Sequence, residues 1–418
     1  MEVFKFGGAS IKDAEGIRNL AKIVSLNSEK QLLIIVSAMG KMTNALEDLT
    51  TAYINRQDDT NSLFEVVRQY HHEILLDLFE SEDLPIFDDV ANTLLEIEWM
   101  MDEEPHPDNR FTYDQIVSVG ELLSSRIVSA YLNFKGLRNK WLDARGFILT
   151  DNTYREGVVD WDKSCKAIST VPPMLKDQFV VTQGFIGGTS ENFTTTLGRE
   201  GSDYSAAVFA ACLKADNVTI WKDVPGVLSA DPKLYADAQK YAELPYSEAM
   251  EMSYYGATVI HPKTIKPLQN SGIPLRVKPF LNPDESGTNI TENGSICKDF
   301  PAIIVKQKQT LASISTKDFS FVTEDNLSEI FQSFAAVKLK INMMQVSALS
   351  FSACFDEDKE KFELLLLALQ PAFKVKYNQN LQLVTVRHYK PETIDKLSFG
   401  RTVLIEQISR NTAQLVLQ

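Results

Sequence analysis

Short apolar runs alternate with amphipathic stretches over most of this chain. Residues 2–6 form an apolar run that ends at two glycines, and apolar residues at helical spacing follow it, with Ser10 and Asp13 at the spacing of a capping box. The run at 31–37 is almost wholly apolar, which is typical of a strand buried on both faces of a parallel sheet. Strand, helix and buried strand in this order predict a βαβ unit.

The middle of the chain continues this alternation. Residues 44–101 are acidic and largely at helical spacing. We expect helices at 61–79, 88–101, 120–134 and 202–214, a loop at 102–109, and strands at 146–149, 179–183 and 218–221. This order predicts an α/β fold with a mainly parallel central sheet.

The predicted segments become shorter near Asp299, after a turn-rich stretch at 282–294 that we interpret as a linker. We expect strands at 302–306, 310–315, 343–355, 373–377, 381–387, 403–408 and 413–417, and helices at 325–335, 358–369 and 391–397. The pattern predicts two domains, residues 1–298 and 299–418, the second built from one or two small α+β modules.

Length and composition agree with a globular protein of more than one domain. The chain has 418 residues, and one core rarely serves more than about 300. The net charge of −14 argues against nucleic-acid or anionic-membrane partners. We expect no signal peptide, no membrane span and a cytoplasmic location. The four cysteines form no CxxC pair, so we expect isolated reduced thiols.

Two glycine-bearing segments stand at predicted helix starts. In the first, KFGGAS, Gly7 and Gly8 let the backbone approach an anion, and Lys5 can reach phosphate oxygens. The pattern GxxxxGK[ST] is absent, so this segment alone also fits a tight turn with a surface lysine. In the second, GREGSD, Arg199 can bind a carboxylate through two hydrogen bonds, but an ordinary capped helix explains the segment too.

Three further polar segments are candidates. SAMGKMTN at 37–44 follows the buried strand at its carboxyl end, where α/β sheets place ligands. Glu121 can pair with an ammonium group or simply favour a helix N-terminus. WKDVPG at 221–226 and ADPK at 230–233 form an extended loop with lysines that can reach phosphate. Each segment alone also fits a polar loop or connection.

Taken in order, these segments resemble the aspartokinase family, in its monofunctional form, of the amino-acid-kinase superfamily. The resemblance rests on KFGGAS, SAMGKMTN, SVGELLSS, TTTLGREGSDYSA, WKDVPGVLSADPK, YSEAMEMSYYGATVIHP and IPLRVK followed by GTNI. It is dense over about residues 2–290 and looser beyond, where the chain is similar to a pair of ACT modules. The resemblance implies a three-layer αβα amino-acid-kinase fold, followed by ferredoxin-like ACT modules.

The resemblance also implies an ATP-dependent aspartate kinase, the first step of lysine, threonine and methionine biosynthesis. By position it assigns catalysis to Lys5 and Asp203. It assigns L-aspartate binding to Ser37, Thr43, Glu121, Arg199 and Ser202. It assigns nucleotide binding to Lys5, Gly7, Gly8, Ser10, Lys222, Asp223 and Lys233.

The chemistry of the implied reaction suits this inventory. A side-chain carboxylate with a pKa of about 3.9 is ionised at neutral pH and needs no general base. Positioning and charge stabilisation then suffice for phosphoryl transfer. We expect Mg²⁺ to be carried mainly by ATP, with no protein metal site, since the adjacent His71 and His72 point to different helix faces.

Four positions depart from the family pattern. Ala9 removes a hydroxyl near the phosphates, Glu200 replaces a common glycine, Leu228 replaces an aromatic residue of some members, and Lys233 replaces arginine. None removes an essential charge, and we expect Glu200→Gly to keep or improve activity.

The C-terminal resemblance implies a homodimer through ACT-like modules. It also raises an amino-acid effector, lysine or threonine, but residues 323–329 and 388–392 lack the glycine-bearing ligand loop typical of such modules, so feedback stays open. Two other functions stay open as well. One is a related kinase acting on glutamate, N-acetylglutamate, carbamate or UMP. The other is a catalytically weak amino-acid sensor.

Overall fold

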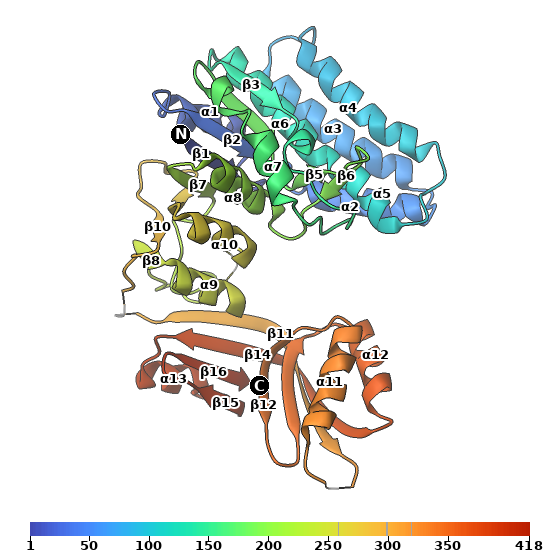
Figure 1. Ribbon diagram of the computed structural model, residues 1–418, viewed down its shortest axis with the longest axis vertical. Helices are drawn as coiled ribbons and strands as arrows, with labels where there is room; N and C mark the ends of the chain where they lie inside the picture. The colour runs from blue at the N-terminus through green and yellow to red at the C-terminus, as the bar shows by residue number, and fades with distance from the viewer. Residues whose placement is uncertain (258, 298–299, 319) are drawn as a thin grey trace. The chain divides into compact units, whose positions relative to one another are not determined.

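A computed structural model describes residues 1–257, 259–297, 300–318 and 320–418, drawn as ribbons in Figure 1. The chain forms two compact units. The first contains Met1–Val227, Lys240–Met250 and Val259–Ile296, and the second contains Leu228–Gln239, Glu251–Thr258 and Cys297–Gln418. The predicted boundary between residues 298 and 299 lies outside the described residues, so the two-domain division stays a prediction.

An eight-stranded sheet forms the centre of the first unit. Its order is β3 (Asn139–Leu142), β4 (Phe179–Gln183), β2 (Leu32–Val36), β1 (Glu2–Phe6), β7 (Asn217–Lys222), β9 (Leu275–Pro279), β10 (Thr288–Thr291) and β8 (Glu243–Pro245). Neighbouring strands are parallel except for β9 and β10. The expectation of an α/β fold with a mainly parallel sheet is confirmed.

Helices cover both faces of this sheet and complete the three-layer αβα arrangement. On one face α6 (Val119–Phe134) contacts β2, β3 and β4, and on the other α8 (Gly201–Leu213) contacts β1, β2 and β7. The remaining helices of the unit are α1 (Ala14–Ser25), α2 (Met42–Ile54), α3 (Thr60–Leu78), α4 (Pro85–Met101), α5 (Asn109–Val117), α7 (Trp161–Ile168) and α10 (Pro262–Ser271), while α9 (Tyr246–Tyr255) spans the division between the units. Two short strands, β5 (Ile186–Gly188) and β6 (Thr194–Thr196), form a hairpin.

The alternation within β1 decides where its lysine points. Successive side chains of a strand face opposite sides of the sheet. Phe4 and Phe6 pack in the core formed with α1 and α6, whereas Lys5 faces α8, where it meets an acidic partner. All five residues of β2 are buried because both of its faces are covered.

The second unit contains a six-stranded antiparallel sheet. Its order is β12 (Ile341–Val346), β13 (Phe351–Asp356), β11 (Ala302–Thr316), β14 (Phe373–Arg387), β16 (Thr412–Leu417) and β15 (Val403–Ile408). One apolar cluster packs α11 (Glu324–Ala336) and α12 (Lys359–Leu369) against the sheet, and another includes residues of α13 (Pro391–Ser398). The long strands β11 and β14 lie at the centre of this sheet and contribute to both apolar clusters, as in two ACT-like modules that share a sheet.

Several local predictions were wrong. The first helix begins after Asp13, whose side chain accepts from the Gly16 amide, so Ser10 is not its cap. The strand expected at 146–149 does not form: residues 144–146 form a 3₁₀ turn, and Leu149 makes only an isolated bridge to Gly188. The stretch 282–294 is not merely a linker, since β10 pairs with β9 and β8 in the main sheet. Residues 343–355 belong to two strands rather than one.

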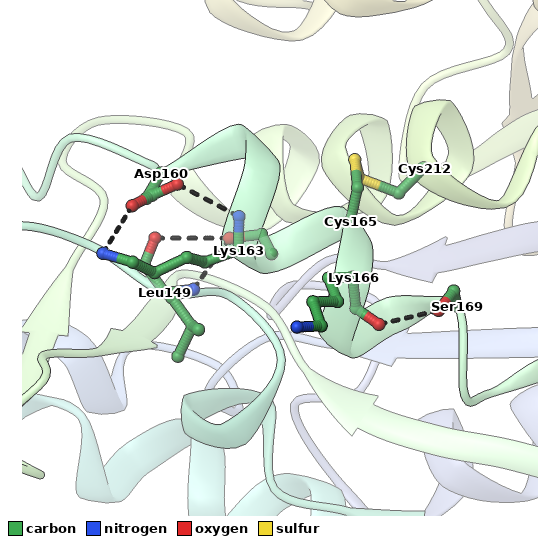
Figure 2. Close-up of a disulfide and its surroundings, with 8 residues drawn as sticks. Leu149, Asp160, Lys163, Cys165, Lys166, Ser169 and Cys212 are labelled. Atoms are coloured by element: carbon green, nitrogen blue, oxygen red, sulfur yellow. Dashed lines mark hydrogen bonds and ion pairs between the residues drawn. A yellow bond between two sulfur atoms is a disulfide. The ribbon is translucent and has the colours of Figure 1, made fainter.

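The expectation that all cysteines are isolated thiols was also wrong. Cys165 on α7 and Cys212 on α8 form a disulfide with a Cα–Cα distance of 4.8 Å (Figure 2). These cysteines are 47 residues apart in sequence, and the packing of α7 on α8 makes them neighbours. Cys354 is a buried free thiol. In the part of the chain that the structure describes, no helix has both the length and the apolar character needed to cross a bilayer.

Candidate active site

Four neighbouring strands end at the same edge of the main sheet. Because β4, β2, β1 and β7 are parallel, the loops that follow them converge there. Backbone hydrogen bonds join these loops: the Ser37 amide donates to the Phe6 carbonyl at 3.2 Å, and the Gly40 amide donates to the Gly8 carbonyl at 3.0 Å. The glycine loop and the loop after the buried strand therefore form one surface.

Two glycines are required by close approach at this edge. A Cβ atom on Gly8 would lie 2.4 Å from the Ala38 carbonyl oxygen, so any side chain would push the two loops apart. A Cβ atom on Gly184, which follows β4, would lie 2.5 Å from the Ser202 Cβ atom. Gly184 thus allows the first turn of α8 to pack directly against the strand ends.

A buried carboxylate joins two lysines beneath these loops. The Asp203 carboxylate lies 2.5 Å from Lys5 Nζ through one oxygen and 3.2 Å from Lys222 Nζ through the other. Glu200 lies farther from Lys222, at 3.9 Å, and Lys222 also donates to the Val259 carbonyl. We call Lys5, Asp203, Lys222 and Glu200 the lysine cluster. It brings together side chains from β1, the end of β7 and the start of α8.

The opposite charges of Asp203 and Lys222 favour the ionised form of each other. Burial alone raises the pKa of Asp203, but the positive charges of Lys5 and Lys222 outweigh burial and hold this pKa below its usual value. Burial alone lowers the pKa of Lys222, but Asp203 and Glu200 outweigh burial and raise it. Lys222 is therefore held as a cation at an edge where phosphate can approach.

Glu121 lies near the same cluster in a different electrostatic state. It stands in the first turn of α6 and is only 3% exposed. One carboxylate oxygen accepts a hydrogen bond from the Ala38 amide at 3.1 Å, and the other has no hydrogen-bond partner. Burial raises its pKa to about 8, although the Ala38 amide and the charge of Lys5 oppose the rise. Glu121 is therefore a protonated acid at neutral pH.

The other predicted substrate residues lie at the start of α8 and in the loop that follows β2. Ser202 is buried in the first turn of α8, and Arg199 is exposed just before that helix. The Arg199 guanidinium makes no ion pair with any residue that the structure describes. Ser37 and Thr43 are half-buried in the loop after β2 and at the start of α2. The predicted contact of Arg199 with a substrate stays a prediction.

The predicted nucleotide residues divide between the two units. Gly7 is half-buried beside Lys5, and the Ser10 hydroxyl donates to the Trp221 carbonyl at 3.5 Å. Asp223 is exposed directly after β7. Lys233 belongs to the second unit, so its assignment to the nucleotide loop stays a prediction.

Sequence reasoning missed Asp114 on α5. This buried carboxylate accepts from the Thr196 hydroxyl at 2.7 Å, the Thr196 amide at 3.0 Å and the Arg155 amide at 2.9 Å. Burial raises the pKa of Asp114 to about 6, against the effect of these hydrogen bonds. Asp114 therefore anchors β6 three residues before Arg199. The signal in the sequence was an acid at an otherwise apolar helical position.

The donor set of the site suits phosphate better than a bare cation. The buried carboxylate of Asp203 is already paired with two lysines, and Glu200 lies beside one of them. Within residues 1–257, 259–297, 300–318 and 320–418, no group of three histidine, cysteine, aspartate or glutamate side chains is placed to hold a metal ion. These residues fit a polyphosphate that brings its own Mg²⁺.

Comparison with known proteins gives a consistent pattern. Residues 1–279 match the model of the amino acid kinase family. The chain is 30% identical to the lysine-sensitive aspartokinase 3 of Escherichia coli over 92% of this chain and 86% of that protein. It is 31% identical to the bifunctional aspartokinase/homoserine dehydrogenase 2 of Arabidopsis thaliana over 89% of this chain.

A solved structure extends the likeness to the whole chain. The crystal structure of E. coli aspartokinase III in complex with aspartate and ADP superposes with a TM-score of 0.85 at 25% identity, covering 100% of this chain and 96% of that one. The chain spans less than half of the length of the first curated relatives that it matches, 42% for the Arabidopsis protein.

Proposed function

We propose that this chain, which belongs to the amino acid kinase family and within it to the aspartokinases, transfers the γ-phosphoryl group of ATP to the side-chain carboxylate of L-aspartate. The products are 4-phospho-L-aspartate and ADP. One observation carries the proposal: the buried Lys5 and the half-buried Lys222, joined by Asp203, stand beside a glycine loop at the ends of four parallel strands. The E. coli relative was solved with aspartate and ADP, which supports the same pair of ligands here.

The lysine cluster supplies the charge that phosphoryl transfer requires. We assign Lys5 to the oxygens between the β- and γ-phosphates, with Asp203 holding its side chain in place. Lys222 and Asp223 contact the nucleotide, together with Lys233, while Gly7, Gly8 and Ser10 line the phosphoryl group. Mg²⁺ bound to ATP supplies further neutralisation of the transferring phosphate.

Aspartate binds as a zwitterion in this proposal. Arg199 holds the α-carboxylate through its planar guanidinium, and Ser37, Thr43 and Ser202 contribute hydrogen bonds. Glu121 receives the α-ammonium group, for which its unpartnered oxygen is available. An ammonium beside this acid favours the charged form, so aspartate binding would expel the proton that Glu121 carries in the empty site.

The accepting carboxylate needs no general base. The side chain of aspartate is already ionised at neutral pH, and its oxygen attacks the γ-phosphorus directly. Catalysis then consists of alignment and of stabilising the negative charge on the phosphoryl oxygens. This requirement agrees with a site whose buried cations are lysines.

The finer assignments complete the proposal. We propose catalytic and regulatory domains divided near residues 298 and 299, a homodimer formed through the ACT-like modules, a cytoplasmic location and a role at the head of lysine, threonine and methionine synthesis. A lysine or threonine effector is also proposed, and the lysine sensitivity named for the E. coli relative supports lysine as the first to test.

The test is a hydroxylamine trapping assay with ATP, Mg²⁺ and L-aspartate. An acyl phosphate reacts with hydroxylamine, so hydroxamate should accumulate with wild-type protein and not when aspartate is omitted. Activity with glutamate, N-acetylglutamate, carbamate or UMP but not aspartate would overturn the substrate assignment. Inactivity with every acceptor would favour the sensor alternative.

A further inference from the structure

A cavity lies in the first unit, between α4, α6 and β3. Its volume is about 470 Å³, within the range of about 300–1,000 Å³ that is usual for small-molecule sites. Its lining includes Phe79, Leu84, Ile86, Asp89, Arg126, Ala130, Phe134 and Trp141. None of these residues belongs to the candidate active site. We call this cavity the Arg126 pocket.

The helical repeat of α6 creates one wall of the pocket. Arg126, Ser129, Ala130 and Asn133 recur at spacings of three and four residues and therefore share a face of the helix. Ser129 and Asn133 are already hydrogen-bonded to Asn139, the first at 2.6 Å and the second at 2.9 Å. The polar groups of Ser129 and Asn133 therefore already have hydrogen-bond partners within the protein.

Arg126 is a half-buried cation in the wall of this pocket. Its guanidinium carbon lies 4.2 Å from the centre of the Trp141 ring, and its Nε atom is buried without a hydrogen-bond partner. In the described part of the chain, it makes no ion pair. Burying part of a charged group without a compensating hydrogen bond is costly. The pocket therefore presents a guanidinium, which forms no ion pair with a described residue, against an apolar, aromatic wall.

Trp141 is held in place from its other side. Its indole Nε1 donates to the Ser125 hydroxyl at 2.9 Å, and the Gln183 side chain donates to the same hydroxyl at 2.7 Å. The aromatic wall is thus anchored to the end of β4. A rigid aromatic surface with a guanidinium stacked on it suits a flat or branched apolar group that ends in a carboxylate.

We propose that the Arg126 pocket binds a small carboxylate with an apolar body, either an apolar α-amino acid or the corresponding acid without an amino group. The carboxylate pairs with Arg126, and the apolar body lies among Phe79, Ile86 and Trp141. Asp89 has no ion-pair partner among the described residues. The ammonium group of an amino acid would pair with Asp89, whereas an acid without an amino group would make no such pair. This binding does not depend on the proposed kinase activity.

Isothermal titration calorimetry on the full chain tests the proposal, with L-phenylalanine, 3-phenylpropanoate and phenethylamine as probes. We expect at least one of the two carboxylates to bind, and phenethylamine, which lacks a carboxylate, to bind at least tenfold more weakly. Arg126→Gln should weaken the carboxylate at least tenfold, which matches the loss of one charged hydrogen bond. Arg110→Gln is the matched control, because Arg110 is exposed and paired with Asp108.

A second variant keeps the test independent of the arginine. Ala130→Leu adds apolar atoms to the pocket wall and leaves Arg126 in place, so it should also weaken binding at least tenfold, and thermal melting checks that it folds. Tighter binding of phenylalanine than of 3-phenylpropanoate, lost in Asp89→Asn, assigns an amino acid; the reverse order assigns a simple acid. No binding of either carboxylate at about 10 mM, or equal binding to wild type and Arg126→Gln, overturns the proposal.

Discussion

Two buried carboxylates in the candidate active site are in opposite charge states. Asp203, on the α8 side of the sheet, is paired with two lysines that hold its pKa low. Glu121, on the α6 side, has one backbone hydrogen bond and one unpartnered oxygen, and burial raises its pKa to about 8. Desolvation acts on both, and the number of nearby cations decides the outcome.

Asp203 therefore has its full set of charged partners inside the protein, whereas Glu121 does not. Asp203 has its counter-charges within the protein, so we propose that it positions Lys5 and Lys222. Glu121 lacks a full counter-charge, so we propose that it binds a charged group of the substrate. Four experiments, from the largest expected effect to the smallest, test whether the two sides of the site differ in this way.

Asp203→Asn should have the largest effect. It leaves Lys5 and Lys222 without their shared carboxylate, and breaking the buried Lys5–Asp203 ion pair costs about 3–5 kcal/mol of stability. Misplacement of Lys5 should also lower kcat by about a hundredfold or more. Urea melts and the hydroxamate assay measure the two losses. Asp77→Asn, which breaks an exposed pair with Arg18, is the control and should change both values little.

Glu121→Gln should change the pH dependence of stability. The unfolded glutamate loses its proton near pH 4.5 and the folded one near pH 8, so the folded state binds more protons between these values. Wild-type stability from this group is therefore present below about pH 4.5 and falls as the pH rises toward 8, by up to several kcal/mol. The glutamine variant should lack this fall.

The same variant should weaken aspartate binding, because glutamine cannot become an anion. We expect its KM for aspartate to rise at least tenfold with KM for ATP little changed. Calorimetry in buffers of different ionisation enthalpy should detect proton release when aspartate binds to wild type at pH 7, and none in the variant. Proton release that persists in Glu121→Gln would contradict the proposed ammonium site.

Lys222→Met should weaken nucleotide binding more than it slows chemistry. The substitution removes one cation but leaves the Lys5–Asp203 pair, so we expect KM for ATP to rise about tenfold with a smaller change in kcat. Lys176→Met, at an exposed lysine, is the control. A loss confined to kcat would instead assign Lys222 to the transition state.

Glu200→Gly should have the smallest effect. Glu200 has a φ of 55° at the start of α8, a conformation that glycine adopts without strain, and its carboxylate lies 3.9 Å from Lys222. Its removal should keep or improve kcat/KM. A decrease of kcat/KM by more than about tenfold, or about 1.4 kcal/mol, would mean that Glu200 positions Lys222. It would contradict the view that Glu200 merely offsets part of the positive charge that Lys222 offers to phosphate.

Much of the fold could be predicted from local pattern. The apolar runs at 2–6 and 31–37, with helical spacing between them, predicted a βαβ unit, and β1 and β2 are parallel neighbours in the sheet. The predictions failed where long-range pairing overrides local signals. The turn-rich stretch at 282–294 contains β10 because β8 and β9 offer it partners, and the Ser10 hydroxyl donates to the distant Trp221 carbonyl while Asp13 caps the helix.

The sequence by itself determined which chemical groups are present: a lysine before a glycine loop, an acid in the first turn of α8, a glutamate in α6 and four cysteines. Only the tertiary structure decided their partners and charge states, because pairing and burial depend on distances between residues far apart in the chain. Lys222 therefore shares Asp203 with Lys5, Glu121 keeps its proton, Cys165 meets Cys212, and Arg126 lines a cavity without forming an ion pair with any described residue.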